Sequence, residues 1–148
     1  MRNIKYLVVH CTAGPQDQTT ASIKKYWKNS LGWKNVGYHF LIAKDGSYER
    51  LASDDTVTNG VAGYNSVSMH ISYKGGVDKK GNGLDNRTPE QKKTLVTLLK
   101  TLRAKYPKAI IQGHRDFSPD KNKNGKIEPW EFIKICPSFD AKTEYKNI

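Results

Sequence analysis

Cysteine and long apolar runs are both scarce in this sequence, and each absence excludes a class of protein. The 148 residues contain two cysteines, Cys11 and Cys136, so the chain is not a small scaffold held by disulfides. A metal-bound or buried thiol is the better expectation. No run of about 18 apolar residues occurs, so we expect no membrane-spanning helix. The N-terminus lacks the apolar region and cleavage site of a secretory signal, which predicts synthesis in the cytoplasm.

Acidic residues are the other deficit. The chain has 14 Asp and Glu against 25 Lys and Arg, which gives a net charge of +11 at pH 7. That balance favours polyanionic partners such as nucleic acid, an anionic membrane or a bacterial envelope. The basic residues are spread along the chain without an arginine-rich arm, so no nucleic-acid surface can be mapped. Eight Tyr, four Phe and three Trp exclude a disordered chain, since they can bury a large area.

Apolar runs separated by turn residues predict an α/β (α+β) fold, a central mixed sheet flanked by helices. The length of the chain predicts that residues 1–148 form a single domain, which we expect to be monomeric. Strands are expected at 4–10, on both sides of Asp45-Gly46, at 67–73 and at 109–112, and helices from about 21, from 88 and near 129–135. Asp45-Gly46 predicts a tight hairpin in which both residues adopt positive φ.

The helix after residue 88 has the clearest signals. Thr88 is the expected N-cap, Pro89 takes the first helical position, and Gln91 completes a capping box. A stripe of leucines then predicts one apolar face, formed by Leu95, Leu98, Leu99 and Leu102. This helix is expected to cover the sheet.

Three residues form a candidate metal site. His10 and His114 each follow an apolar run that reads as a strand, and Cys136 lies in a C-terminal loop. Imidazole and thiolate suit Zn²⁺, and three protein ligands leave a fourth position open for water, as in catalytic sites. Alternation along the first strand places Cys11 on the opposite face, where a small core residue is the better interpretation. On spacing alone, a strand-end histidine held by a hydrogen bond explains His10 as well.

Several motifs carry a family resemblance over nearly the whole chain. In order they are HCTA, GWKNVGYHFLIAKDG, GYN, the helix beginning TPEQ, GHRD and KICPSFD. This set resembles the zinc-dependent N-acetylmuramoyl-L-alanine amidases, in particular the small phage lysozyme-type amidases, which are relatives of the peptidoglycan recognition proteins. The resemblance implies the amidase fold, one Zn²⁺ and peptidoglycan as substrate. The expected reaction is hydrolysis of the amide between N-acetylmuramic acid and L-alanine.

The same resemblance implies roles for individual residues. His10, His114 and Cys136 would hold zinc, Tyr38 would match the catalytic tyrosine, and Lys134 would match the lysine near the metal. An ammonium group near the metal can stabilise an oxyanion, and a phenol can orient water or pass a proton to the leaving amine. Without the resemblance, a core aromatic and a solvated lysine would be the simpler interpretations of Tyr38 and Lys134.

Two further residues are candidates for contacts behind the metal ligands. Asp116 is expected to orient an imidazole, or else to pair with Arg115 or another cation. His39 is expected either behind a ligand or in the core. The sequence departs from the family pattern at Gly60, where a histidine is common, at Val67, where asparagine is common, and at His70, where glycine is common. His70 is not expected to be a ligand.

A last motif interrupts the segment between His114 and Cys136. Within an insertion at 117–131, the stretch DKNKNGKIEPWE matches an EF-hand loop. Its predicted calcium ligands are the side chains of Asp120, Asn122, Asn124 and Glu131 and the carbonyl of Lys126. Few carboxylates and three lysines predict weak affinity. The alternative is an Asn/Gly turn followed by a capped helix.

The sequence therefore predicts a zinc amidase of the endolysin or autolysin type that reaches the cell wall after release by another route. One alternative is a non-catalytic peptidoglycan-binding module, which the presence of Tyr38, Lys134 and Cys136 disfavours. The other is a basic factor that binds protein or nucleic acid, prompted by the net charge.

Overall fold

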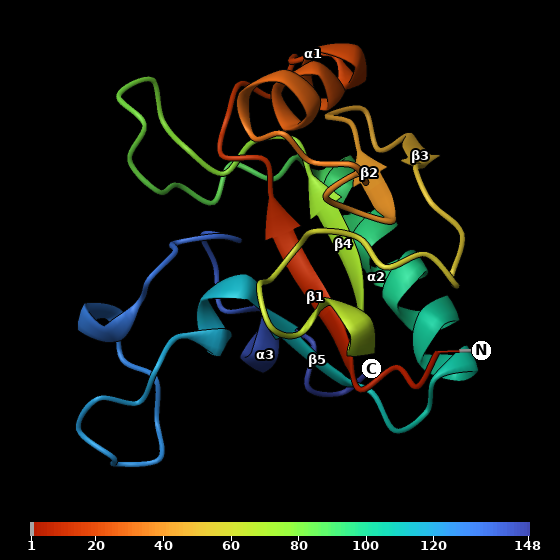
Figure 1. The fold of residues 1–148 in the computed structure, drawn as a ribbon. Helices are drawn as coiled ribbons and strands as arrows, with labels where there is room; N and C mark the ends of the chain where they lie inside the picture. The colour runs from red at the N-terminus through yellow and green to blue at the C-terminus, as the bar shows by residue number, and fades with distance from the viewer. Residues whose placement is uncertain (1) are drawn as a thin grey trace.

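The computed structural model describes residues 2–148 and places a five-stranded sheet at the centre of the molecule (Figure 1). The strands lie in the order β3-β2-β4-β1-β5. Their bounds are β1 Tyr6–Cys11, β2 Phe40–Ile42, β3 Tyr48–Arg50, β4 Ser68–Tyr73 and β5 Ile110–Gly113. Strand β1 runs parallel to both β4 and β5, and β2 is parallel to β4 but antiparallel to β3. The predicted mixed sheet is confirmed.

The pairing brings the chemistry to one edge of the sheet. β1 is enclosed on both sides, and its last residues, His10 and Cys11, pair with Ser72 and Tyr73 of β4. β5 runs in the same direction and delivers His114 immediately after its end. Carboxyl ends of parallel strands meet at the same edge, which is where open α/β sheets bind their ligands.

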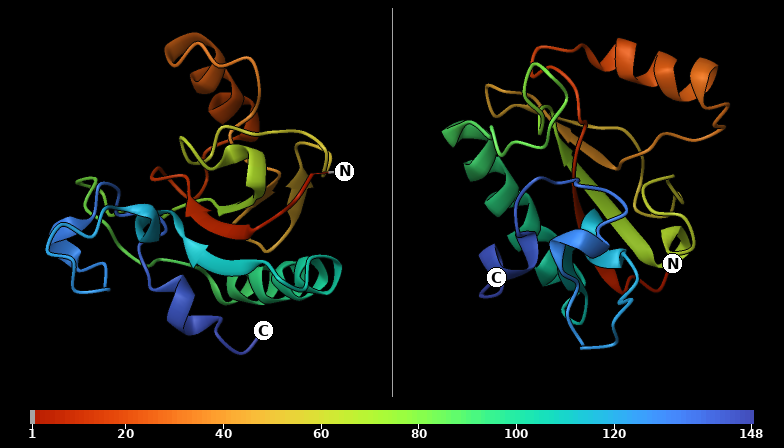
Figure 2. Two further views of the ribbon diagram at one scale, coloured as in Figure 1. Left: turned by 60° about the horizontal axis from the view of Figure 1, so that its bottom comes forward. Right: turned by 90° about the vertical axis from the view of Figure 1, so that its left-hand side faces the viewer.

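The helices cover both faces of the sheet. α2 (Pro89–Lys105) and the short α3 (Ala141–Glu144) lie on one face, and α1 (Thr20–Lys25) lies on the other (Figure 2). The face under α2 holds the main core, where Leu7 and Val9 of β1 meet Leu95 and Leu99. A smaller cluster of Ile23, Trp27 and Leu41 packs beneath α1 on the other face. Within residues 2–148, no helix combines the length and apolar character needed to cross a membrane.

The predicted capping of α2 is present in full. The Thr88 hydroxyl accepts from Gln91 N–H at 3.1 Å, and the Gln91 side chain accepts from Thr88 N–H at 3.0 Å. The four leucines of the predicted stripe are all buried. The predicted capping box and the predicted apolar face of α2 are therefore both confirmed.

Two local predictions are wrong. In the β2–β3 connection only Gly46 has positive φ, at +88°, because the turn begins at Ala43 and spans more residues than a two-residue hairpin. The helix predicted near 129–135 is a single 3₁₀ turn, Pro129–Glu131, after which Phe132 is extended. Ile133 is 69% exposed, so no apolar face is buried that could support a longer helix.

Further irregular elements complete the chain. A π-helical turn, Tyr26–Ser30, continues α1, and 3₁₀ turns span Asn65–Val67 and His114–Phe117. The N-cap of α1 is Thr19, whose hydroxyl accepts from Ser22 N–H at 3.1 Å. The turn His114–Phe117 follows β5 at the sheet edge that carries His10, whereas Asn65–Val67 precedes β4 and lies at the opposite edge, where Val67 accepts from Lys5 N–H.

Candidate functional site

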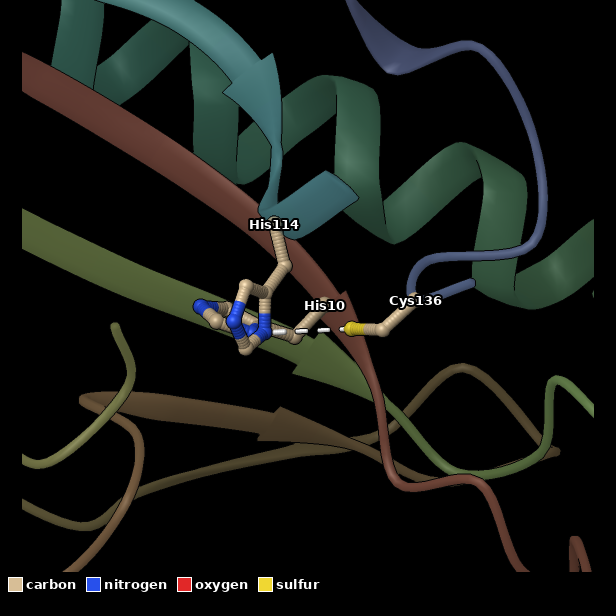
Figure 3. Close-up of side chains that lie close together, drawn as sticks. All are labelled: His10, His114 and Cys136. Carbon is tan, nitrogen blue, oxygen red and sulfur yellow. Dashed lines mark hydrogen bonds between the residues drawn. The ribbon is translucent and has the colours of Figure 1, made fainter. Parts of the chain in front are cut away.

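Three donor groups from distant parts of the chain converge at the end of β1. One ligand atom from each of His10, His114 and Cys136 lies within 4.8 Å of the others. Figure 3 shows His10 reaching toward the sulfur, with Cys136 Sγ 3.6 Å from His10 Nδ1. Among residues 2–148, this is the one group of three or more His, Cys, Asp or Glu side chains close enough to share a metal ion.

Backbone hydrogen bonds hold Cys136 against the two histidine-bearing strands. Arg115 N–H donates to the carbonyl of Cys136 at 2.9 Å, which ties the cysteine to the turn after β5. Cys11 N–H points at Cys136 Sγ at 3.1 Å, which ties it to the end of β1. The predicted role of Cys11 is consistent with this geometry, because its own side chain belongs to the main core.

Burial sets the protonation of the three donors. It lowers the pKa of His10 well below 6.5, and with the charge of Lys134 it lowers the pKa of His114 to about 4. Both imidazoles are therefore neutral at pH 7 and able to offer a lone pair. Burial raises the pKa of the Cys136 thiol, while the charge of Lys134 acts in the opposite direction. A bound cation would be needed to remove the thiol proton.

The chemistry of the donors fits a transition metal. Imidazole and thiolate are borderline and soft ligands, whereas calcium and magnesium take oxygen ligands. Three protein donors on one side leave room for a further ligand from the cleft.

A cleft of about 790 Å³ opens beside the three donors. His114 lines it directly, and so do aromatic side chains from the π-helical turn after α1 and from the segment that follows. The aromatic lining residues are Tyr26, Trp27, Trp33 and Tyr38. Of these, Trp27 is also a core residue.

Among these aromatic residues, Tyr38 is the one in contact with His10. Its ring centroid is 5.1 Å from that of His10 and 5.3 Å from that of Trp27. The hydroxyl donates to the carbonyl of Cys11 at 3.3 Å. Burial raises the pKa of Tyr38 above its ordinary value, so the phenol keeps its proton at neutral pH.

Lys134 lies on the rim of the same cleft. Its side chain is exposed and lines the wall together with His114. A positive charge therefore lies close to the metal donors without being buried among them.

The structure gives Asp116 a role that differs from both expectations. Among residues 2–148, its carboxylate hydrogen-bonds Gly113 N–H, at 2.8 Å, and neither an imidazole nor a cation is its partner. This bond lies in the turn His114–Phe117, so Asp116 shapes the backbone that carries His114. The carboxylate expected to orient an imidazole or to pair with a cation is used instead by the local turn.

His39 lies in the core, fully buried. Its Nδ1 accepts from His70 N–H at 3.1 Å, and its Nε2 is 2.8 Å from the carbonyl of Thr56. It supports the backbone of β4, the strand next to β1.

Sequence reasoning missed His70 and Asn65. His70 Nδ1 is 2.8 Å from His10 Nε2, and His70 Nε2 is 2.9 Å from Asn65 Oδ1. The signal available was register: two histidines that end up on the same face of adjacent strands. It could not be used before the pairing of β1 with β4 was known.

The predicted calcium-loop residues fold into a compact turn closed by its own hydrogen bonds. Asp120 accepts from Gly125 N–H at 2.8 Å, and the buried Glu131 accepts from Glu128 N–H at 2.8 Å and from Lys121 N–H. Asn122 and Asn124 donate their amide N–H groups to Glu128, and Asn124 Oδ1 accepts from Lys126 N–H at 3.0 Å. These bonds occupy the predicted side-chain ligands, and the calcium site stays a prediction.

The neck of this segment is closed as well. Ile133 N–H donates to the Ser118 hydroxyl at 3.0 Å, just inside the Arg115–Cys136 backbone bond. Residues 119–132 therefore leave and rejoin the fold at nearly the same point.

The sequence matches known proteins along most of its length. The profile of the N-acetylmuramoyl-L-alanine amidase family matches residues 1–129. The endolysin of Enterobacteria phage K11 is 40% identical over 141 residues, which cover 94% of this chain and 83% of that protein.

The structure also matches solved proteins. An endolysin N-acetylmuramoyl-L-alanine amidase, LysCS from Clostridium intestinale, superimposes with a TM-score of 0.73 at 25% identity, covering 97% of this chain and 80% of that chain. PGRP-SA of the bumblebee superimposes with a TM-score of 0.73 at 18% identity, covering 99% and 83%, and so shares the fold.

Proposed function

The chain belongs to the N-acetylmuramoyl-L-alanine amidase family, and from this premise we propose that it hydrolyses the amide between N-acetylmuramic acid and L-alanine with a zinc ion held by His10, His114 and Cys136. The observation that carries the proposal is the convergence of two neutral imidazoles and a thiol at the side of a deep cleft. Bound zinc would supply Lewis acidity for the amide carbonyl and lower the pKa of a water to about 7.

Tyr38 would hold a proton beside the scissile amide. Its phenol stays protonated, and by turning its one O–H from the Cys11 carbonyl it could donate to a substrate oxygen or to the departing amine. The neighbouring rings of His10 and Trp27 restrict its position. We therefore assign Tyr38 the role of hydrogen-bond donor in the reaction.

Lys134 can stabilise negative charge on the carbonyl oxygen as the tetrahedral intermediate forms. It lies on the rim next to His114, and its charge also favours the thiolate form of Cys136. Both effects require a cation at this position.

The aromatic lining of the cleft offers a surface for the substrate. Tyr26 is 54% exposed although it lines the cleft, and Trp33 stacks on Trp27 with ring centroids 6.3 Å apart. Rings of this kind bury apolar sugar and peptide faces and leave polar groups free to hydrogen-bond.

Three wider assignments belong to the same proposal. Residues 1–148 act as one catalytic domain and as a monomer, and the protein meets the cell wall after release from the cytoplasm by another route. Calcium, if it binds at 120–131, has a structural role only.

Mass analysis of muropeptides released from purified peptidoglycan, together with zinc content, tests the function. We expect about one zinc per chain, free stem peptides, and loss of activity with a chelator. Cys136→Ser should lose zinc and activity but stay folded. The matched control, Cys11→Ala, removes the neighbouring thiol and should keep both. Protein that leaves peptidoglycan intact after zinc addition would contradict the enzymatic assignment.

A further inference from the structure

A chain of hydrogen bonds runs from the proposed metal centre through a buried histidine to an asparagine, and the mechanism above makes no use of it. It links His10 Nε2 to His70 Nδ1 at 2.8 Å and His70 Nε2 to Asn65 Oδ1 at 2.9 Å. His10 is 1% exposed and His70 is fully buried, so the bond between the two imidazoles is shielded from water, while Asn65 is half-buried. His70 does not line the cleft beside the metal donors.

Asn65 fixes the direction of every bond in the chain. Its Oδ1 also accepts from Val61 N–H at 2.8 Å, and a backbone N–H can only donate, so this atom is the amide oxygen. His70 must then carry its hydrogen on Nε2, which makes its Nδ1 an acceptor. His10 consequently donates through Nε2 and keeps a lone pair on Nδ1. That nitrogen is the one 3.6 Å from Cys136 Sγ.

The space for the His70 ring depends on a glycine. A Cβ at Gly60 would lie 2.3 Å from His70 Nδ1 and 2.5 Å from Cε1, well inside contact distance. On the other side His39 stacks on His70, with ring centroids 6.1 Å apart and planes at 21°. The ring is thus held between a glycine backbone and a second histidine, with both nitrogens bonded.

We propose that His70 is a positioning residue for the metal ligand His10, fixing its tautomer and ring orientation so that Nδ1 faces the metal. The inference rests on the proposed zinc site. A ligand imidazole that donates its other N–H to an acceptor is oriented and made more basic, and loss of such a partner typically weakens metal binding about 10–100-fold.

Two substitutions separate the hydrogen bond from ring packing. His70→Phe keeps a ring of similar shape but offers no acceptor to His10 Nε2. His70→Asn places a carbonyl oxygen close to the position of Nδ1 and can accept that bond. Zinc affinity, measured by competition with a chromogenic chelator, should fall about 10–100-fold in His70→Phe and recover most of that loss in His70→Asn. Melting temperatures of the metal-free variants report on packing.

The outcomes are distinct. Wild-type affinity in His70→Phe, or equal loss in both variants, would overturn the positioning role while leaving the zinc site intact. Failure of the wild-type protein to bind zinc would refute the proposed function instead. Should His70→Phe not fold, imidazole ¹⁵N spectra of the zinc-loaded wild-type protein decide the question. His70 must then carry its hydrogen on Nε2 and His10 must be metal-bound through Nδ1; the reverse tautomers contradict the proposal.

Discussion

At the scale of single residues, Tyr38 shows how burial can preserve a proton for chemistry. Its ring is packed between His10 and Trp27, and the residue lines the same cleft as His114. The phenol can therefore donate at neutral pH without becoming a phenolate.

Replacement of Tyr38 by Phe removes only this donor. We expect the turnover number to fall roughly 10²–10³-fold, because a lost transition-state donor costs about that much. Zinc content and melting temperature should stay near wild type. Steady-state kinetics on a soluble muropeptide measure the effect, with Tyr48→Phe as control, since Tyr48 is 52% exposed on β3. Similar rates in the two variants would exclude a role for the Tyr38 hydroxyl in the reaction.

His39 links the fold to pH. Burial lowers its pKa from 6.5 to about 4, so between these values the unfolded chain binds more protons than the native one. The free energy of unfolding must therefore fall as pH falls from 6.5 toward 4, by at most about 1.4 kcal/mol per pH unit for this group.

A non-titrating substitute tests this contribution. In His39→Asn the side-chain oxygen can still accept from His70 N–H, but the proton linkage is lost. Urea unfolding at about pH 7 and about pH 5 should show a smaller pH-dependent loss in the variant than in the wild-type protein. An equal loss of stability between the two pH values in both proteins would mean that other buried groups, not His39, cause the pH dependence.

At the scale of elements, predictability followed the range of the interactions. The start of α2 was predictable because Thr88 and Gln91 satisfy each other within one turn. The alternation of β1 was predictable because one face, with Leu7 and Val9, packs into the main core and the other ends in His10. The helix predicted at 129–135 failed because an EF-hand pattern supplies a start signal but no apolar face to bury. His70 and Asn65 could not be found because their partner, His10, lies across a strand pairing.

The predicted calcium loop can be tested as an element. If residues 120–131 bind calcium in the native state only, millimolar Ca²⁺ should raise the melting temperature of zinc-loaded protein, since ligand binding stabilises by mass action. Glu131→Gln should reduce the rise, because it weakens the one carboxylate expected to bind in bidentate fashion. Magnesium serves as the control ion. A melting temperature unchanged by calcium would contradict calcium binding at residues 120–131.

At the scale of the whole molecule, the net charge of +11 should act on encounter with the wall more than on bond cleavage. Raising the salt from ~0.1 M to ~1 M shortens the screening length from about 10 Å to about 3 Å. We expect lysis of whole envelopes to slow markedly over this range. Cleavage of a short soluble muropeptide should change little. If salt slowed the cleavage of both substrates equally, the charge would act on the catalytic step itself.

The closed neck between Ser118 and Ile133 has a consequence for protein engineering. Because residues 119–132 depart and return at one hydrogen-bonded point, their length is uncoupled from the positions of His114 and Cys136. The segment could therefore be replaced by a shorter turn, an epitope or a wall-targeting peptide without moving His114 or Cys136. Long insertions at such a point cost little loop entropy.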